Sequence, residues 1–444
     1  MRKILPVIVS MLFFVANTKA QEVTPLSLKD CMDYALKHNY SIKNAQIDVL
    51  IQHAQNNETL SAAYPHINGK AEVDDYLNPM KTFIDGGYFG YPGQIIGFPF
   101  ALNYAGSASV NASQLLFDGS VFVAVKARNT VMELARQNSE VTEETVRYNV
   151  YKAYNSLVIA YRQYDIIKKS LSYARSLEHD VIVTQENGFA EKIDVERTSV
   201  QVNNLATDSM SIGNLLAISE QVLKYQMGMD LHKPIVLTDT VLENRRQNVL
   251  TLIDEQEEYD RIPEFNVLNT TLKLNEYNLK RYQLTAWPSV NAFGTMGYNY
   301  GANKFNDIMS LSNYAFNSMI GLQLNVPIFN GLMRANQVTE AKLNIDKSKN
   351  NIEYLKQTID FQAAQARTSL RNTVLQVQSQ HRNMDLANDV LDLAQRKYKG
   401  GVGSNLEVTQ AQTDQLRAQT NYFSSLLDLI NAEADLKKAL GLLK

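Results

Sequence analysis

The sequence contains two copies of one pattern, and this duplication limits the folds that the chain can adopt. Three landmarks recur at an offset of 212 or 213 residues, and they are Phe117-Asp118-Gly119 with Phe329-Asn330-Gly331, Gly188 with Gly401, and Gly228 with Gly441. A period this long makes each copy half of a protein rather than a short solenoid repeat. We therefore expect two similar halves, residues 21–228 and 263–444, joined by an equatorial connecting segment of residues 229–262. Within this segment we expect a small strand from Ile235 to Leu237 and a short helix from Val249 to Tyr259.

Each half contains one very long helical segment without proline, at about residues 120–187 and 332–399. Each helix would be about 100 Å long at 1.5 Å per residue. Ile345, Ile352 and Ile359 are seven residues apart, as in coiled-coil seams. In each half a shorter helix and a return helix nearly match the long helix in length, and these are predicted at 41–62 with 191–228 and at 264–286 with 404–441.

Four segments alternate between apolar and polar residues, which predicts strands. They form one hairpin in each half, at about residues 66–116 and 289–328. Segments of roughly ten residues with this alternation fit a membrane-spanning barrel, and a soluble two-sided sheet alternates as well. The barrel is favoured because all four segments adjoin long helices in a chain that begins with an export signal. The polar positions that we expect to face the lumen are Asn68, Lys70, Glu72, Asp74, Asn291, Gln323 and Asn325.

Four strands are too few to close a barrel, because single-chain barrels start at about eight. Open strand edges do not occur within lipid. Several copies must therefore pool their strands, and two copies give eight whereas three give twelve. The arithmetic does not choose between these two numbers. The segment between the first two strands, at about residues 78–100, is expected outside the cell. It either constricts the mouth of the pore or is a tolerated surface insertion, and we favour the insertion.

The start of the chain and its charge narrow the functional classes. Residues 1–20 combine a basic start, an apolar run and a small-residue cleavage pattern, so they predict a signal peptide. The 43 basic and 46 acidic residues give a formal net charge of −3, so no basic face for nucleic acid is expected. No pattern of catalytic residues, metal ligands or phosphate-binding glycines stands out, so no enzyme activity and no cofactor are expected.

These features together resemble the TolC family of outer-membrane factors. The residues that carry the resemblance are Leu26-Ser27-Leu28 through Ala35-Leu36 with Asn39, Tyr64-Pro65, Trp287-Pro288, Leu116-Phe117-Asp118-Gly119 and Ile328-Phe329-Asn330-Gly331. The resemblance implies a homotrimer with a 12-stranded barrel in the outer membrane and an α-helical barrel extending into the periplasm. It also implies a periplasmic adaptor and an inner-membrane transporter as partners, in efflux or type I secretion. The competing hypothesis is a soluble periplasmic coiled-coil adaptor or chaperone.

The turns between the long and the return helices are the candidate contact sites. Glycine in these turns is explained first by a backbone that needs positive φ. In the family these turns meet the adaptor, so the resemblance implies adaptor contacts at Gly188, Phe189, Gly401, Val402 and Gly403.

Two acids follow the turns at matching places, Asp194 and Glu407. An acid at a helix start is commonly present because it is stabilised by the helix dipole. In the family, carboxylates at this place ring the closed periplasmic end of the pore, so the resemblance implies a gate role. Gln410 stands where a second acid would follow one turn on. We therefore expect a single ring at Glu407, joined by Asp194.

Overall fold

The computed structural model describes residues 24–99, 102–238, 246–310 and 313–443. The predicted signal peptide at residues 1–20 lies outside this range. The described chain forms two compact units, each built from both halves of the sequence. Unit 1 takes residues up to 45, then 140–262 and 358–444, whereas unit 2 takes residues 46–139 and 263–357.

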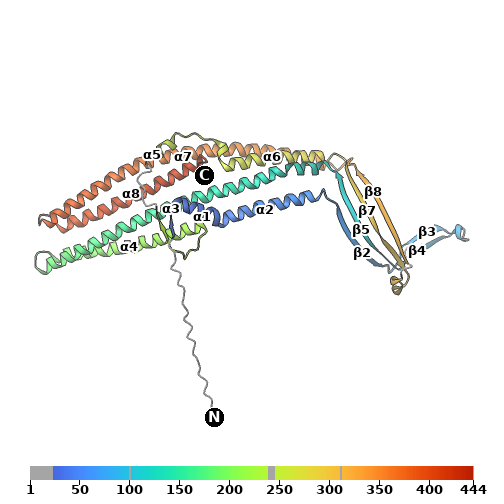
Figure 1. Ribbon diagram of the computed structural model, residues 1–444, viewed down its shortest axis with the longest axis horizontal. Helices are drawn as coiled ribbons and strands as arrows, with labels where there is room; N and C mark the ends of the chain where they lie inside the picture. The colour runs from blue at the N-terminus through green and yellow to red at the C-terminus, as the bar shows by residue number, and fades with distance from the viewer. Residues whose placement is uncertain (1–23, 100–101, 239–245, 311–312, 444) are drawn as a thin grey trace, which may run out of the picture. The chain divides into compact units, whose positions relative to one another are not determined.

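Helices dominate unit 1 (Figure 1). It holds α1 (Leu28–His38), α4 (Lys192–Met227) and α8 (Asn405–Ala439), together with the greater part of α3 (Gly119–Glu186) and the second part of α7 (Met333–Lys399). Its main core contains Val150, Tyr154 and Leu157 of α3 and Ile430 and Leu436 of α8. Along α7, which continues from unit 2 into unit 1, the buried positions Ile352, Ile359 and Ala366 keep the expected spacing of seven residues.

All four helix ends at the duplicated glycines have the same geometry. Gly188, Gly228, Gly401 and Gly441 have φ between 66° and 80°, a region that residues with a Cβ rarely adopt. At each end the glycine N–H and the next N–H bond back to helix carbonyls, as in a Schellman motif. The duplication seen in the sequence is therefore a duplication of helix terminations.

Two of these glycines also sit in tight contacts that match between the halves. A Cβ on Gly228 would lie 2.6 Å from the His38 carbonyl oxygen, and a Cβ on Gly441 would lie 2.8 Å from the Arg261 carbonyl oxygen. His38 ends α1 just before α2 (Tyr40–Ser61), and Arg261 precedes α6 (Pro263–Leu284). Each return helix thus ends against the residues that immediately precede the shorter helix of its own half.

The connecting segment differs in part from the prediction. A parallel pair of β1 (Thr24–Leu26) and β6 (Ile235–Leu237) contains the expected short strand. The expected helix at 249–259 is wrong in its bounds, because α5 spans Arg246–Ile253 and a 3-10 turn follows at Tyr259–Arg261. The Arg367 side chain donates to the carbonyls of Ile253 and Glu255 and pairs with Glu257, so it takes the acceptors that a longer helix would use.

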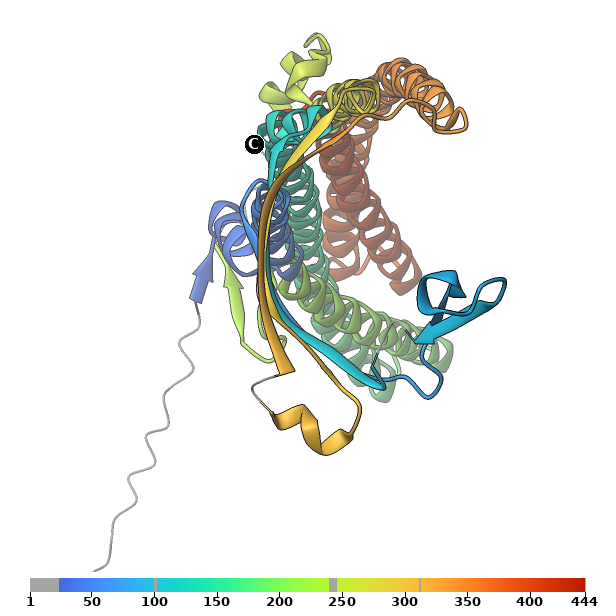
Figure 2. The same cartoon turned by 90° about the vertical axis from the view of Figure 1, so that its right-hand side faces the viewer.

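Unit 2 contains the strand hairpins. Its four-stranded antiparallel sheet has the order β2-β5-β7-β8, with β2 at His66–Asp75, β5 at Tyr104–Phe117, β7 at Ser289–Ala302 and β8 at Tyr314–Asn325. Figure 2 shows the strands side by side in one curved sheet. The second hairpin ends at Asn325, not at 328 as expected, because Pro327 has no N–H to donate to a ladder.

The register confirms the alternation of the four strands. Paired residues of an antiparallel sheet share a face, so Val110 lies with Gly69 and Met296, and Phe316 lies with Tyr298. The aromatic Phe293 on the polar side is accommodated because Gly321 lies opposite, where a Cβ would come within 2.6 Å of the ring.

Of the segment predicted at 78–100, the structure describes residues 78–99, and they contain regular secondary structure. They form a separate antiparallel hairpin of β3 (Lys81–Asp85) and β4 (Ile95–Pro99), with a 3-10 turn at Gly86–Phe89 between the strands. Among the described residues, no helix combines the length and the apolar character that crossing a membrane requires.

Candidate functional site

The two turns of unit 1 present apolar side chains to solvent. Gly188 follows α3 and Gly401 follows α7, and their left-handed φ values of 80° and 72° reverse the chain. The residues after them, Phe189 and Val402, are 85% and 82% exposed. Gly403 avoids a clash of a different kind, because a Cβ there would lie 2.9 Å from the Tyr398 backbone nitrogen. The five predicted adaptor-contact residues therefore lie in two turns (the tips) whose apolar side chains, Phe189 and Val402, are exposed.

The first turns of α4 and α8 are bonded to each other next to these tips. Asn405 is buried, and its amide donates to Thr198 Oγ1 at 2.9 Å and to the Asp194 carbonyl oxygen at 3.3 Å. Thr198 in turn donates to the same carbonyl at 2.7 Å. This network fixes the position of one helix start relative to the other, and sequence patterns alone did not reveal it.

Both predicted gate acids lie in these first turns. Asp194 is half-buried, and Glu407 is exposed with its N–H bonded to the Ser404 side chain at 3.2 Å. Their place at helix starts is explained by the helix dipole. Burial raises the pKa of the nearby Tyr398, and the charges of Asp180 and Asp194 raise it further. The acids thus occupy matching positions on two helices that are bonded to each other.

A further acid on the face of Glu407 was missed by the sequence reasoning. Gln410 donates to Asp414 Oδ2 at 3.1 Å, and Arg417 also pairs with Asp414. The hydrogen bond from Gln410 is the main reason why the pKa of Asp414 is lowered. Glu407, Gln410 and Asp414 are spaced i, i+3, i+7, which places them on one helix face. That spacing was the signal that could have identified Asp414.

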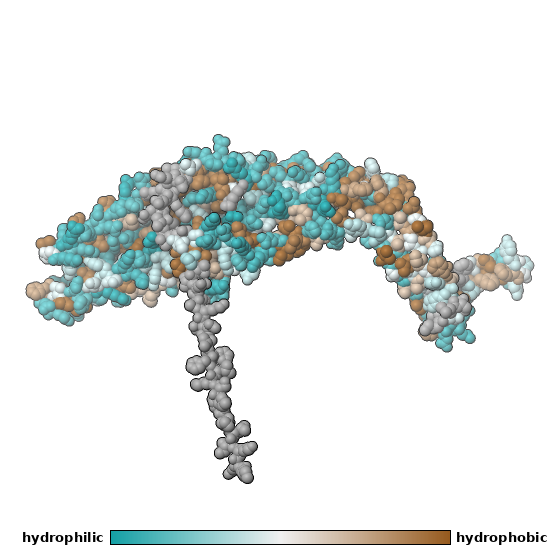
Figure 3. Space-filling view, viewed as in Figure 1, coloured by the Kyte–Doolittle hydropathy of each residue, from teal (hydrophilic) through white to brown (hydrophobic). Residues whose placement is uncertain are grey.

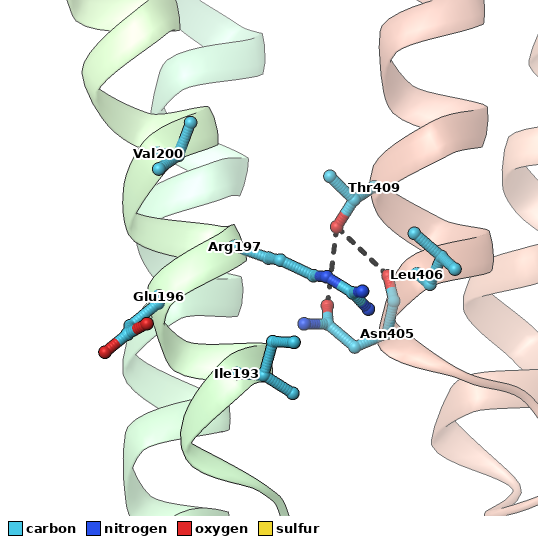
Figure 4. Close-up of a pocket in the computed structure, with 7 residues that line it drawn as sticks. All are labelled: Ile193, Glu196, Arg197, Val200, Asn405, Leu406 and Thr409. Atoms are coloured by element: carbon cyan, nitrogen blue, oxygen red, sulfur yellow. Dashed lines mark hydrogen bonds between the residues drawn. The ribbon is translucent and has the colours of Figure 1, made fainter.

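A groove of about 400 Å³ opens between α4 and α8 at the same level. It is lined by apolar residues from both helices and by polar side chains, and the residues are Ile193, Glu196, Arg197, Val200, Asn405, Leu406 and Thr409. Figure 4 shows Arg197 extending from α4 toward Asn405, whereas Glu196 points away from the groove. Thr409 donates to the Asn405 carbonyl oxygen at 3.0 Å and closes one wall.

The polar positions of the sheet in unit 2 share one face. Asn68, Lys70, Glu72 and Asp74 of β2 alternate with apolar residues, and Lys70 pairs with Glu72 at 2.5 Å. In the other hairpin Asn291 lies opposite Gln323, and Asn325 lies two residues further along the same face. The register therefore joins all seven predicted residues on one face, opposite the face of Ile67, Val110 and Ile320.

The described part of the chain contains no group of three or more histidine, cysteine, aspartate or glutamate side chains that could hold a metal ion.

Comparison with known proteins finds similarity to outer-membrane proteins of efflux pumps. Residues 272–442 match the family model described as outer membrane efflux protein. The solvent efflux pump outer membrane protein SrpC and the toluene efflux pump outer membrane protein TtgI, both from Pseudomonas putida, are each 35% identical over 120 residues. That match covers 27% of this chain and only 25% of either relative.

Solved structures match over nearly the whole chain. The outer membrane protein VceC of Vibrio cholerae superposes with a TM-score of 0.67 at 16% identity, covering 93% of this chain and 96% of VceC. The Campylobacter jejuni CmeC outer membrane channel gives a TM-score of 0.71 at 18% identity, covering 93% and 85%. At such identities the likeness shows the fold, so the predicted fold class of long helices joined to strand hairpins is confirmed.

Proposed function

We propose that this chain, which has an outer membrane efflux protein domain at residues 272–442 and the fold of solved outer-membrane channels, forms the outer-membrane exit channel of a tripartite export system. It works as a homotrimer whose strands span the outer membrane and whose helices extend into the periplasm. It conducts passively, while an inner-membrane transporter and a periplasmic adaptor supply the energy and the connection. The relatives named for solvent and toluene efflux favour small molecules as the cargo.

The two-faced sheet is the observation that carries this proposal. One face holds the seven polar residues named above, and the other exposes large apolar side chains such as Ile67, Ile320 and Leu322. Hydrophobic residues gather over the strands in the space-filling view (Figure 3). An apolar outer face and a polar inner face suit a lipid-embedded pore wall.

The edges of the sheet require partners. β2 and β8 are the outermost strands, and each has a row of unpaired backbone groups. Within lipid such groups cost several kcal/mol each unless another strand pairs with them. Three copies pooling four strands each would close a barrel of twelve, with β8 of one copy antiparallel to β2 of the next.

Exposed apolar residues on the helices support the same assembly. On α7, Tyr354, Phe361 and Leu375 are exposed although they are separated by seven and fourteen residues, the spacing of a coiled-coil seam. α4 exposes a second set at Met210, Ile218 and Tyr225. A helix normally buries such a stripe, so we assign these two faces to contacts between copies.

The gate belongs to the tips of unit 1. Glu407 from three copies, joined by Asp194, forms a ring of carboxylates at the periplasmic end. Two carboxylates about 6 Å apart repel by about 3 kcal/mol at an effective dielectric constant near 20. Such a ring favours cations and opposes tight closure. The exposed Phe189 and Val402, with the neighbouring groove, receive the adaptor.

The test is purification of the full chain in detergent, followed by native mass measurement and planar-bilayer conductance. We expect a heat-sensitive trimer that conducts ions and requires detergent for solubility. A stable monomer that stays in water without detergent would contradict the proposal and favour the periplasmic adaptor or chaperone, a class that usually needs one helical hairpin rather than the two copies found here.

A further inference from the structure

The hairpin of β3 and β4 has a defined turn, a packed face and an exposed apolar face. Its turn is fixed by Asp85, which accepts from the Gly87 N–H at 2.9 Å, and by Gly86, whose N–H donates to the Gln94 carbonyl at 2.7 Å. The rings of Phe89 and Phe98 lie 5.2 Å apart. The hairpin thus has a small packed side of its own.

Its other side has no cover within the described chain. Phe83 and Ile95 lie on the same face by register, and they are 70% and 78% exposed. Tyr88 at the turn is 91% exposed. Burying a side chain such as Phe or Ile is worth roughly 1.5–3 kcal/mol relative to leaving it in water. A clustered apolar surface of this kind marks an interaction site.

The place of the hairpin limits what can cover it. It is joined to the edge strand β2 by the segment Tyr76–Met80, which spans at most roughly 20 Å. The Tyr76 N–H donates to the Asn103 carbonyl oxygen at 2.7 Å. This bond fixes the start of the segment, so the hairpin lies even closer to the end of β2. A strand added at the β2 edge lies about 4.8 Å away, well within that distance.

The neighbouring copy offers a matching surface at this edge. If β8 of the next copy pairs antiparallel with β2, its Tyr314 end lies beside Asp75, where the hairpin begins. The loop that leads into Tyr314 contains a 3-10 turn, Phe305–Met309, and Phe305 is 67% exposed. The hairpin has Lys81 and Asp85 as its only charges, and the loop has Lys304 and Asp307, so opposite charges can pair across the contact.

We infer that the β3–β4 hairpin of each copy docks its Phe83 face on the β7–β8 loop of the neighbouring copy and holds the subunits together at the outer rim of the pore. This inference rests on the trimer of the proposed function. It gives residues 78–100 a structural role in assembly, and the partner it names is a second copy of this chain.

Disulfide trapping in the full-length chain tests the contact. Cys31 is the single cysteine and is buried, so Cys31→Ala supplies the background. Phe83→Cys combined with Phe305→Cys, oxidised in isolated outer membranes, is expected to give covalent dimers and trimers on heated non-reducing gels. Reduction should return them to monomers. The controls carry one cysteine each, Phe83→Cys or Phe305→Cys on the Cys31→Ala background, and should give monomers only.

Several results would overturn the inference. A cross-link within one chain would place the hairpin on its own loop, and a dimer from Phe83→Cys alone would show that hairpins meet each other. Cross-linking to a different protein, or no cross-link within an intact trimer, also contradicts it. If the unmutated chain itself forms no trimer, that result contradicts the proposed function instead.

A stability measurement supplies an independent check. Phe83→Ser with Ile95→Ser keeps the glycines of the turn and removes the apolar face. We expect the temperature at which the detergent-purified trimer dissociates to fall by about 5 °C or more, with single-channel conductance unchanged. Thr82→Ser, on the opposite face of β3, should leave that temperature unchanged. An equal effect of both changes would contradict the inference.

Discussion

At the scale of single residues, the charge at the start of α8 should set ion selectivity. Glu407 is exposed in the first helical turn, so its carboxylate is accessible to passing ions. We expect Glu407→Gln to lower cation over anion permeability several-fold in bilayers, because the substitution would remove the three charges of the proposed ring. Asp208→Asn is the matched control, since it removes one exposed acid from α4 well beyond its first turn. Unchanged reversal potentials in Glu407→Gln would remove Glu407 from the gate.

The acid that sequence reasoning missed has a testable pH dependence. The hydrogen bond from Gln410, with Arg417 nearby, lowers the pKa of Asp414, so the carboxylate stays charged at lower pH than an ordinary aspartate. The interaction is complete above the unfolded-state pKa and is lost as the pH falls through the lower folded-state pKa. In Gln410→Ala that pKa should rise, and carboxyl NMR titration measures the shift. Gln419→Ala, which breaks a bond to Asn388 instead, should not move it.

At the scale of elements, two of the duplicated glycines allow two causes of destabilisation to be measured separately. One cause is backbone strain at positive φ, and the other is the lack of space for a Cβ. Gly441 has positive φ and also lacks room for a Cβ, which would lie 2.8 Å from the Arg261 carbonyl oxygen. Gly188 has positive φ but open space around it. We expect Gly188→Ala to cost about 1–2 kcal/mol through backbone strain alone. Gly441→Ala should cost more because the chain must also shift. Chemical unfolding of the two variants compares them, and equal losses would exclude a role for the tight contact.

The sequence predicted those elements whose signals are local. The missing prolines and the seven-residue spacing of Ile352 and Ile359 give the long helices, and alternation gives the sheet faces. The predicted bounds of α5 were wrong because the Arg367 side chain, more than a hundred residues away, donates to the carbonyls of Ile253 and Glu255 at the end of that helix.

The β3–β4 hairpin was missed because its strands are short. The bond between the helix starts at Asn405 was missed for a related reason, because Asp194 and Asn405 meet only in the fold.

At the scale of the whole molecule, the duplication and the open sheet have one common consequence. Each chain supplies two hairpins that pair with one another, β5 against β7, and leaves β2 and β8 unpaired. A chain with two hairpins needs half as many copies to close a ring as a chain with one hairpin. It still needs other copies, because its own edge strands remain unpaired. The number of copies depends on sheet curvature and subunit contacts, which no local sequence pattern encodes.

Substitutions on the two faces of the sheet can test whether the ring of strands lies in lipid. Ile320 is 90% exposed on the apolar face of β8, and Asn317 lies on the opposite face of the same strand. Arginine at mid-membrane on a lipid-facing position costs about 2–4 kcal/mol, whereas a lumen position faces water. We expect Ile320→Arg to reduce the heat-sensitive trimer recovered from outer membranes sharply, and Asn317→Arg to assemble normally while shifting selectivity toward anions. A soluble two-sided sheet would tolerate both arginines alike, because water would reach both faces, so equal trimer yields would argue against a membrane-embedded wall.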